Sequence, residues 1–198
     1  MSLQKAEQWI RFYVTEMVYV ALLRGINVGG NNIVGMKKLQ AVFESLGFKN
    51  VVTYINSGNI IFESVPDSHE KIALDAAKAI KSEFNLSIKV LVRDFRNIEI
   101  ICRELPAGWV KNERMRTDVM FLWEKYDNRG VLDLMQINPV DNVRYTPGAV
   151  LWNVEGKDYS RSGLSRLVGT DLYRNMTIRN VNTVREIHRI MSGINAGG

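Results

Sequence analysis

Apolar residues along the first half of the chain recur alternately at strand-like and helix-like spacing. Short apolar or alternating runs predict four strands, at residues 18–24, 51–55, 60–63 and 88–93. Between them, apolar residues three and four positions apart predict helices over 36–46 and 72–84. The predicted order is βαββαβ, which is the ferredoxin-like arrangement.

The second half repeats this succession in a shorter form. A helix that ends before Pro106 follows the fourth strand. Beyond it, the pattern predicts a strand, a short helix, a hairpin, a helix, a short strand and a last helix, at residues 118–123, 128–135, 143–154, 161–168, 176–179 and 183–191. We therefore expect an α+β fold of two ferredoxin-like βαββαβ subdomains in tandem, each followed by a helix.

Two pairs of similar segments indicate an internal duplication. NVVTYINSGNIIF (Asn50–Phe62) matches NVRYTPGAVLW (Asn142–Trp152), and VRDFRNI (Val92–Ile98) matches IRNVNTV (Ile178–Val184). The predicted boundaries are an N-terminal extension at 1–16, the first subdomain at 17–106, a linker at 107–117, the second subdomain with its C-terminal helix at 118–192, and a tail at 193–198. Met17 is an alternative to Met1 as the native start.

The halves differ most in the connection that follows the first strand. It is long and rich in glycine in the first half, Gly25–Gly35, and short in the second half, Glu124–Asp127. Shared folding demands explain what the halves have in common, and most such connections are short. A special function is therefore expected where they differ.

This long loop carries residue types that suit an anion. Glycines let a ligand approach backbone N–H groups, asparagines supply amides, and an arginine at the strand end pairs with phosphate or carboxylate. The candidate ligand-binding residues are Arg24, Gly25, Asn27, Gly29, Gly30 and Asn31. Their spacing is neither that of a P-loop nor that of a GxGxxG fingerprint. The alternative is a turn-rich surface loop whose asparagines cap the next helix.

Arg179 and Asn180 are a second candidate, because they precede the last helix and would form an anion clamp at its N-terminus. The alternative is that Asn180 only caps that helix, since Arg93 and Asp94 occupy the same place in the first half. Within one half, we expect the exit of the first strand and the Ser57–Gly58 turn at opposite sheet edges. A single site would then form between the halves, with Arg179 near the long loop.

Charge and composition leave other classes open. From Lys157 onward there are seven basic and three acidic residues, and the basic ones are mostly arginine, which suits nucleic acid. A lone cysteine, Cys102, excludes an internal disulfide and reads as a buried thiol. His69 and His188 come with no metal-ligand spacing, and no catalytic acid, base or nucleophile can be named. No apolar run reaches the ~20 residues of a membrane span. We therefore expect a cytoplasmic protein with no membrane partner, no metal and no cofactor.

Three segments resemble a known bacterial family. LLRGINVGGNN (Leu22–Asn32), TYINSGNIIF (Thr53–Phe62) and TIRNVNTV (Thr177–Val184) are together similar to the domain-of-unknown-function 1697 family, over about Met17 to Met191. The resemblance implies a fold of paired α+β subdomains, but it does not indicate any particular activity. It implies a signature of Arg24, Gly25, Asn27, Gly29, Gly30, Ser57, Gly58, Asn59, Arg179 and Asn180. The family usually has tryptophan after the last asparagine, where this chain has Val181.

The leading interpretation is a protein that binds an anionic or phosphorylated small molecule at the glycine-rich loop. The first alternative is RNA or DNA binding through the arginine-rich C-terminal region. The second alternative is an enzyme acting on a nucleotide-like substrate, with unknown catalytic residues.

Overall fold

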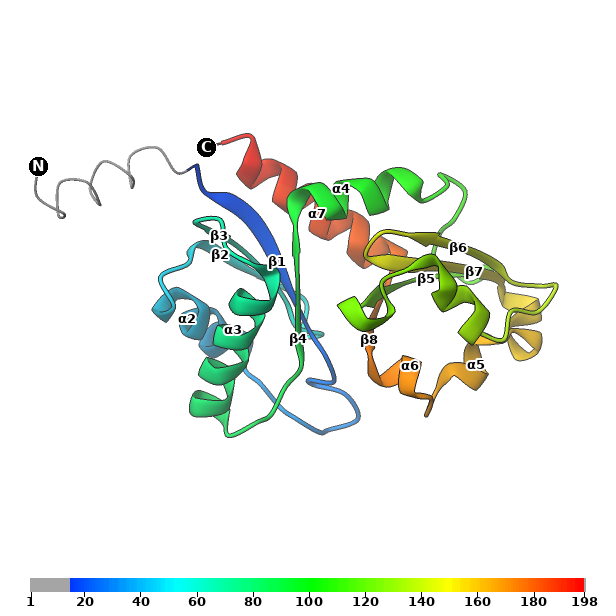
Figure 1. The fold of residues 1–198 in the computed structure, drawn as a ribbon, viewed down its shortest axis with the longest axis horizontal. Coiled ribbons are helices and arrows are strands. Elements are labelled where there is room, and N and C mark those ends of the chain that lie inside the picture. The colour runs from blue at the N-terminus through cyan, green and yellow to red at the C-terminus, as the bar shows by residue number, and fades with distance from the viewer. Residues whose placement is uncertain (1–14, 198) are drawn as a thin grey trace, which may run out of the picture. The chain divides into compact units, whose positions relative to one another are not determined.

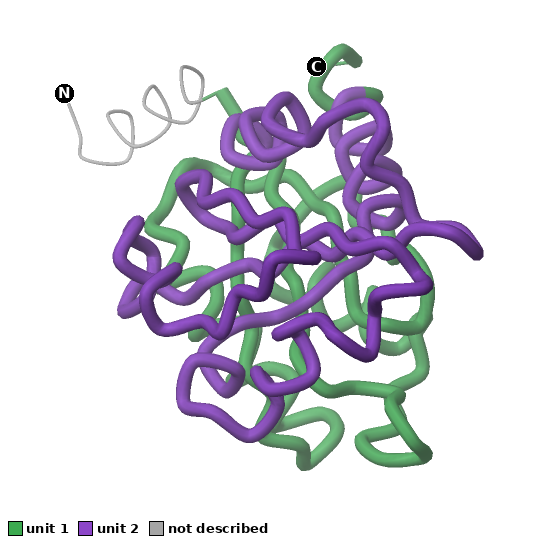
Figure 2. The backbone as a smooth tube through the Cα atoms, turned by 90° about the vertical axis from the view of Figure 1, so that its right-hand side faces the viewer, with its two compact units in different colours: residues 1–94, 193–198 green, residues 95–192 purple. Residues whose placement is uncertain are grey.

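Two four-stranded antiparallel sheets form the framework of residues 15–197, which are the residues that the computed structural model describes (Figure 1). Their strand orders are β2-β3-β1-β4 and β6-β7-β5-β8. The chain divides into two compact units, residues 1–94 with 193–198 and residues 95–192 (Figure 2). The predicted fold class, two α+β subdomains in tandem, is confirmed.

The first unit has the predicted βαββαβ order. Its elements are β1 (Met17–Leu23), α2 (Met36–Ser45), β2 (Lys49–Tyr54), β3 (Asn59–Ser64), α3 (His69–Phe84) and β4 (Val90–Asp94). Alternate residues of β1, Tyr19, Ala21 and Leu23, face the helices, because successive side chains of a strand point to opposite sides. They pack in one buried cluster with Phe43 of α2 and Ile80 of α3, and Figure 1 shows both helices against this sheet.

Hydrogen bonds from nearby side chains fix the N-terminus of α3. Asp67 and Glu70 have capping-box spacing, but the cap is Ser68, whose hydroxyl accepts a hydrogen bond from the Lys71 N–H at 3.2 Å. The Asp67 carboxylate instead accepts from the Ser68 N–H at 2.8 Å and from the Lys71 ammonium.

The second unit is less helical than the pattern predicts. Its elements are α4 (Phe95–Glu104), β5 (Met115–Leu122), β6 (Asn142–Thr146), β7 (Ala149–Glu155), α5 (Leu164–Leu167), α6 (Asp171–Arg174), β8 (Met176–Asn180) and α7 (Val181–Asn195), with 3-10 helices η1 (Glu124–Tyr126), η2 (Arg129–Leu134) and η3 (Gly156–Arg161). Helix α4, predicted as the last helix of the first subdomain, belongs to the same compact unit as β5. Strand β5 begins within residues 107–117, which are predicted as a linker. The other predicted boundaries stay predictions. Most of the predicted extension lies outside the described residues.

Two helices of this unit differ from the prediction, one in type and one in length. The helix expected at 128–135 is a 3-10 helix, and the helix expected at 161–168 is only the short α5. The second is broken because Gly163 N–H donates to Asp141 at 2.9 Å and a Cβ on Gly163 would lie 1.5 Å from the Gln136 carbonyl oxygen. Ser162 is extended there, with ψ 144°, so no helix runs through it.

The strand registers correspond around the first strand of each sheet, β1 and β5. Tyr19 lies opposite Phe62 and Asp94, as Asp118 lies opposite Trp152 and Asn180. This register aligns the same residues that the two pairs of similar segments align in sequence. It supports the proposed duplication, which stays an inference about origin.

No helix within residues 15–197 combines the length and the apolar character needed to cross a bilayer. The expected cytoplasmic location stays a prediction.

Candidate functional site

The long loop after β1 folds back on itself as a small hairpin. Asn31 N–H donates to Val28 C=O at 3.0 Å, and Asn27 N–H donates to Asn32 C=O at 3.1 Å. Between them, Gly29 and Gly30 have φ values of 57° and 79°. Two central residues with positive φ define a type I′ turn, which glycine adopts without steric strain. The glycine pair therefore has a structural reason to be present.

The side chain of Asn27 holds this hairpin to its surroundings. Its Nδ2 donates to the carbonyl oxygens of Val34 at 3.1 Å and Asn56 at 2.9 Å, and its Oδ1 accepts from Val34 N–H at 2.8 Å. Asn32 Nδ2 donates to Gly25 C=O at 2.9 Å. These two amides are engaged within the protein. Any contribution of Asn27 to ligand binding is therefore indirect, through the shape of the loop.

The hairpin meets the turn between β2 and β3, contrary to the expectation from the sequence. Leu23 N–H donates to Gly58 C=O at 2.8 Å. A Cβ on Gly58, whose φ is 77°, would lie 2.7 Å from Ile26 Cδ1 and 2.8 Å from Leu23 Cβ. The prediction of opposite edges is wrong because β1 and β3 are antiparallel neighbours, so the end of β1 lies beside the start of β3. We call residues 24–35 and 55–59 the loop–turn junction.

The tip of the hairpin leaves hydrogen-bond donors open. Within the described part of the chain, no hydrogen bond uses the N–H of Gly29 or Gly30 or the side-chain amide of Asn31. All three residues are exposed, and a Cβ on either glycine would meet nothing within 4 Å. A ligand can therefore approach these N–H groups directly.

Two basic residues and the start of α2 belong to the loop–turn junction or adjoin it. Arg24 is half-buried at its base, and its N–H donates to Lys89 C=O at 3.0 Å, which brings a second basic residue to the same place. Residues 24–43 and 54–62 contain no carboxylate. Helix α2 has no side-chain cap and no acidic residue in its first turn, so the positive end of its dipole is not neutralised from within the helix. The junction therefore suits an anion.

The turn also contains a residue that sequence reasoning missed. Ile55 has φ 48°, a conformation that is rare for a β-branched residue, and its side chain is 46% exposed. Nothing in the local sequence predicts this conformation. Lys89 was missed as well, because its position depends on the pairing of β4 with β1.

The second candidate pair lies in the other unit and is engaged there. Arg179 is 8% exposed, and its guanidinium donates to Thr177 Oγ1 at 3.0 Å and Ile178 C=O at 2.9 Å. Burial lowers the pKa of Arg179 to about 10, so it remains charged at neutral pH. The interpretation of Asn180 as a cap is confirmed, since its Oδ1 accepts from Thr183 N–H at 3.0 Å.

Arg93 of the first unit matches Arg179 in burial and in contact. It is also 8% exposed, and its guanidinium donates to the preceding carbonyl, that of Val92, at 3.0 Å. The buried arginine is thus a feature of both sheets. A clamp that joins Arg179 to the long loop stays a prediction. Val181, where the resemblance implies a tryptophan, is buried in this chain.

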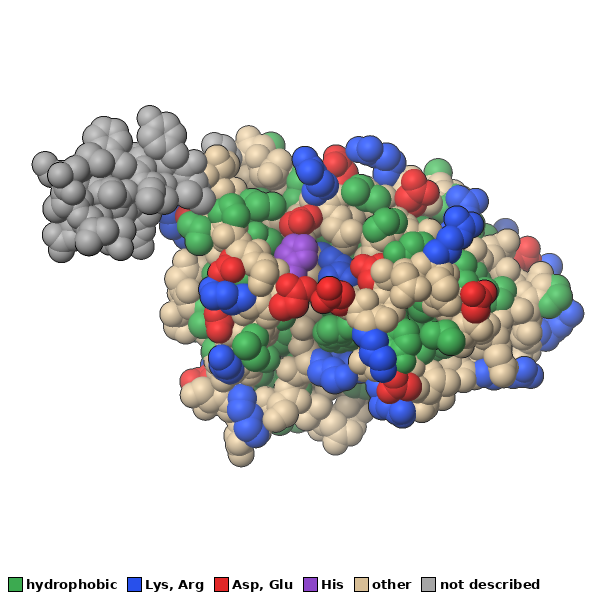
Figure 3. Space-filling view, viewed as in Figure 1, with side chains coloured by type: hydrophobic (Ala, Val, Ile, Leu, Met, Phe, Trp, Pro, Cys, Tyr) green, Lys and Arg blue, Asp and Glu red, His purple; other side chains and the backbone are tan. Residues whose placement is uncertain are grey.

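The arginines of the C-terminal region are engaged with neighbouring residues. The partners are Asp158 for Arg161 at 3.0 Å, Gln136 for Arg166 at 2.9 Å, Asp171 for Arg174 at 3.6 Å and Glu186 for Arg189 at 2.7 Å. On the face drawn in Figure 3, basic and acidic side chains are interspersed. This distribution gives no specific support to the nucleic-acid alternative.

Other reactive side chains are scattered. Among residues 15–197 no group of three or more histidine, cysteine, aspartate or glutamate side chains could hold a metal ion. His69 Nε2 lies 3.3 Å from Asp94 Oδ2, while the His188 ring stacks on Phe95 with centroids 5.7 Å apart. Burial raises the pKa of Cys102 to about 11, so this thiol is a poor nucleophile at neutral pH.

Comparison with known proteins identifies relatives but no activity. A family model described as "Protein of unknown function (DUF1697)" matches residues 17–152, which include the whole loop–turn junction. The structure is similar to that of conserved bacterial protein SP0830 from Streptococcus pneumoniae, with a TM-score of 0.77 and 26% sequence identity, covering 89% of this chain and 99% of that one. No protein with a curated description matches the sequence.

Proposed function

Because this chain belongs to the DUF1697 family, whose description states no activity, we propose its function from the loop–turn junction. The junction binds the anionic group, a phosphate or a carboxylate, of a small molecule. The observation that carries this proposal is the pair of open N–H groups, those of Gly29 and Gly30, on a hairpin whose shape is fixed by Asn27.

Consecutive N–H groups in a turn with positive φ bind anions through their aligned dipoles. A loop that is already held in shape loses little conformational freedom when the ligand arrives. Arg24, Lys89 and the uncapped start of α2 add positive charge around the same hairpin. The anion therefore meets donors and cations without a competing carboxylate from residues 24–43 or 54–62.

The test must separate the folding role of the glycines from the binding role. Gly29→Asn creates an Asn-Gly pair, which is the most favoured sequence for a type I′ turn, while it places a side chain beside the open N–H groups. We expect inorganic phosphate to shift the amide NMR signals of Gly29 and Gly30 saturably in the native chain. In Gly29→Asn we expect about tenfold weaker binding, because the added side chain keeps phosphate from one of the two N–H groups and a hydrogen bond to a charged group contributes about 1.5 kcal/mol.

Gly47→Asn is the matched control. Gly47 also has positive φ, 84°, with open space around it, but it follows α2 rather than β1. Its substitution is expected to leave phosphate binding unchanged. Chloride at the same ionic strength is expected to give no saturable shift. If phosphate gives none either, or if Gly29→Asn binds it as the native chain does, the proposal is wrong.

The two alternatives keep distinct tests. Nucleic-acid binding predicts affinity for oligonucleotides that falls steeply with salt, as counterions are released. An enzyme on a nucleotide-like substrate predicts turnover of the bound molecule. No contact among the described residues favours either alternative over binding alone.

A further inference from the structure

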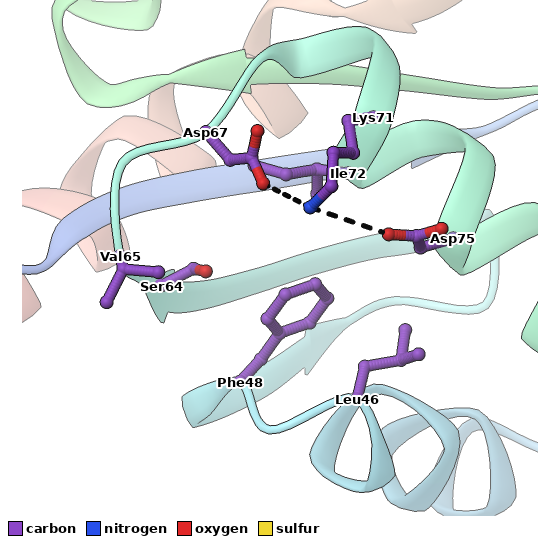
Figure 4. A pocket seen from close by; sticks show the side chains of 8 residues that line it. All are labelled: Leu46, Phe48, Ser64, Val65, Asp67, Lys71, Ile72 and Asp75. Carbon is purple, nitrogen blue, oxygen red and sulfur yellow. Dashed lines mark hydrogen bonds and ion pairs between the residues drawn. The ribbon is translucent and has the colours of Figure 1, made fainter. Parts of the chain in front are cut away.

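The first unit contains a cavity away from the loop–turn junction, between the ends of α2 and β3 and the start of α3 (Figure 4). Its volume is about 180 Å³. Leu46, Phe48 and Ile72 form an apolar floor, and Asp67, Lys71 and Asp75 form a charged rim. A cavity of about 150 Å³ accommodates benzene, so this one has room for one aromatic ring with a short substituent.

One residue of the cavity floor, Phe48, belongs to a stack of aromatic rings. The Phe48 ring stacks on Phe62 with centroids 4.4 Å apart and an interplanar angle of 21°. Phe62 stacks in turn on Tyr19 at 5.9 Å, and Tyr19 is buried within the sheet. Phe48 is thus the last ring of a packed stack. An aromatic ring offers a large apolar surface, and another ring packs on it in an offset stack or edge to face.

The rim of the cavity favours a cation. Lys71 hydrogen-bonds to Asp67, whereas it lies 3.9 Å from the Asp75 carboxylate. The other basic partner of Asp75, Lys78, is 4.0 Å away. Both distances are at the outer limit of an ion pair, so Asp75 retains capacity to accept hydrogen bonds.

We propose that this cavity binds a small primary ammonium ion with an apolar body. The ammonium group pairs with Asp75, and the apolar body lies against Phe48, Leu46 and Ile72. The lining carries two carboxylates and one ammonium, so an anion is repelled and a neutral molecule gains no ion pair. This site is independent of the proposed anion site and selects the opposite charge.

Three probes of nearly equal size test the charge preference. Phenethylammonium is expected to shift the amide NMR signals of Val65 and Ile72 saturably at pH 7. 2-Phenylethanol, its neutral analogue, is expected to bind at least fivefold more weakly, and 3-phenylpropionate is expected not to bind. Equal binding of the alcohol and the ammonium ion, or binding of the propionate, would overturn the proposal.

Two variants test the assignment of residues. Asp75→Asn is expected to lower the affinity for phenethylammonium about fivefold, to that of the alcohol, while Phe48→Leu lowers the affinity for both probes. Glu70→Gln is the matched control, because Glu70 lies exposed on the same helix and does not line the cavity. If Glu70→Gln lowers the affinity for phenethylammonium as much as Asp75→Asn does, the loss reflects the overall charge of the helix, and the assignment of Asp75 as the ion-pair partner is wrong. An unchanged affinity in folded Asp75→Asn would equally contradict the assignment.

Discussion

In both units the end of the first strand makes the same backbone hydrogen bond to the hairpin turn of its sheet. The segment that follows this strand differs between the units. In each unit, the last residue of the first strand donates its N–H to a glycine carbonyl in the hairpin turn: Leu23 to Gly58 at 2.8 Å and Leu122 to Gly148 at 3.0 Å. In the first unit Asn27 then holds a long loop in place, whereas in the second unit Asp127 lies between two short 3-10 helices, η1 and η2.

The difference between these two polar residues explains the two loop shapes. Asn27 both donates and accepts, so it joins two carbonyl groups and one N–H and stabilises an extended hairpin. Asp127 only accepts, and its Oδ1 receives Gly148 N–H at 2.8 Å and Tyr145 O–H at 3.0 Å. Although the strand-to-turn hydrogen bond is the same in both units, the connection after the first strand forms an exposed hairpin in the first unit and short 3-10 helices in the second. The candidate site lies in the first unit.

The largest loss of stability is expected when a side chain is added at the turn glycine that accepts the hydrogen bond from the first strand. Gly58→Ala forces a Cβ to within 2.8 Å of Leu23 Cβ, so we expect a loss of about 3 kcal/mol of unfolding free energy. Gly148→Ala meets only the Asn97 side chain, which can move, so we expect about 1.5 kcal/mol. Urea denaturation followed by circular dichroism measures both values.

Gly47→Ala isolates the backbone contribution, because Gly47 has positive φ with open space around it. Its expected loss is about 1 kcal/mol. A loss in Gly58→Ala no greater than this would mean that the close approach of the two segments does not restrict the first unit.

A reciprocal exchange tests the two polar residues. Asn27→Asp removes both donors and turns a carboxylate oxygen toward two carbonyl oxygens, so we expect a loss of about 2 kcal/mol at neutral pH. Asp127→Asn retains an acceptor for Gly148 and Tyr145, so we expect about 1 kcal/mol. Denaturation gives the totals, and hydrogen exchange at Val34 reports the local loosening. If Asp127→Asn loses more unfolding free energy than Asn27→Asp, the donors of Asn27 are not what distinguishes the two loops.

The smallest effect concerns one exposed carboxylate in each unit. Hydrogen bonds from Tyr126 and Lys125 hold the pKa of Asp171 below its usual value of 3.8, and those from Lys71 and Ser68 do the same for Asp67. A lowered native pKa contributes stability above the unfolded value and loses it as pH falls through the native one. Asp171→Asn and Asp67→Asn should each slightly flatten the fall in melting temperature below pH 3.8.

Asp133→Asn is the control for both carboxylates, since Asp133 is exposed and makes no ion pair or hydrogen bond with another described residue. Asp133→Asn should leave the dependence of melting temperature on pH unchanged in this range. An equally flattened slope in this variant would assign the effect to net charge instead of to the named partners.

The sequence predicts the first unit well because its apolar spacing is strong and its breaks coincide with turn residues. It predicts the second unit less well, because residues 128–135 and 161–168 have helical spacing but the fold bends them through tertiary contacts. The contact of Gly163 with Asp141 and Gln136 is such a case, since these residues are far apart in sequence. A local pattern carries no information about that approach.

The candidate site shows a similar division. The open tip at Gly29 and Gly30 follows from the sequence, but the internal role of Asn27 and the neighbourhood of Lys89 depend on strand pairing. The cavity beside Phe48 also escapes sequence reasoning, because three segments, residues 46–48, 64–67 and 71–75, line it. Residue type thus indicates the donors, while topology decides which of them remain available.

The open hairpin tip has a practical consequence for engineering. Insertions are tolerated where the backbone is exposed and makes few internal hydrogen bonds, and the link between Gly29 and Gly30 meets both conditions. A foreign peptide spliced in there should leave the fold intact. The same graft would cover the donors proposed to hold a ligand, so an insertion that the fold tolerates would report on the proposed binding by abolishing it.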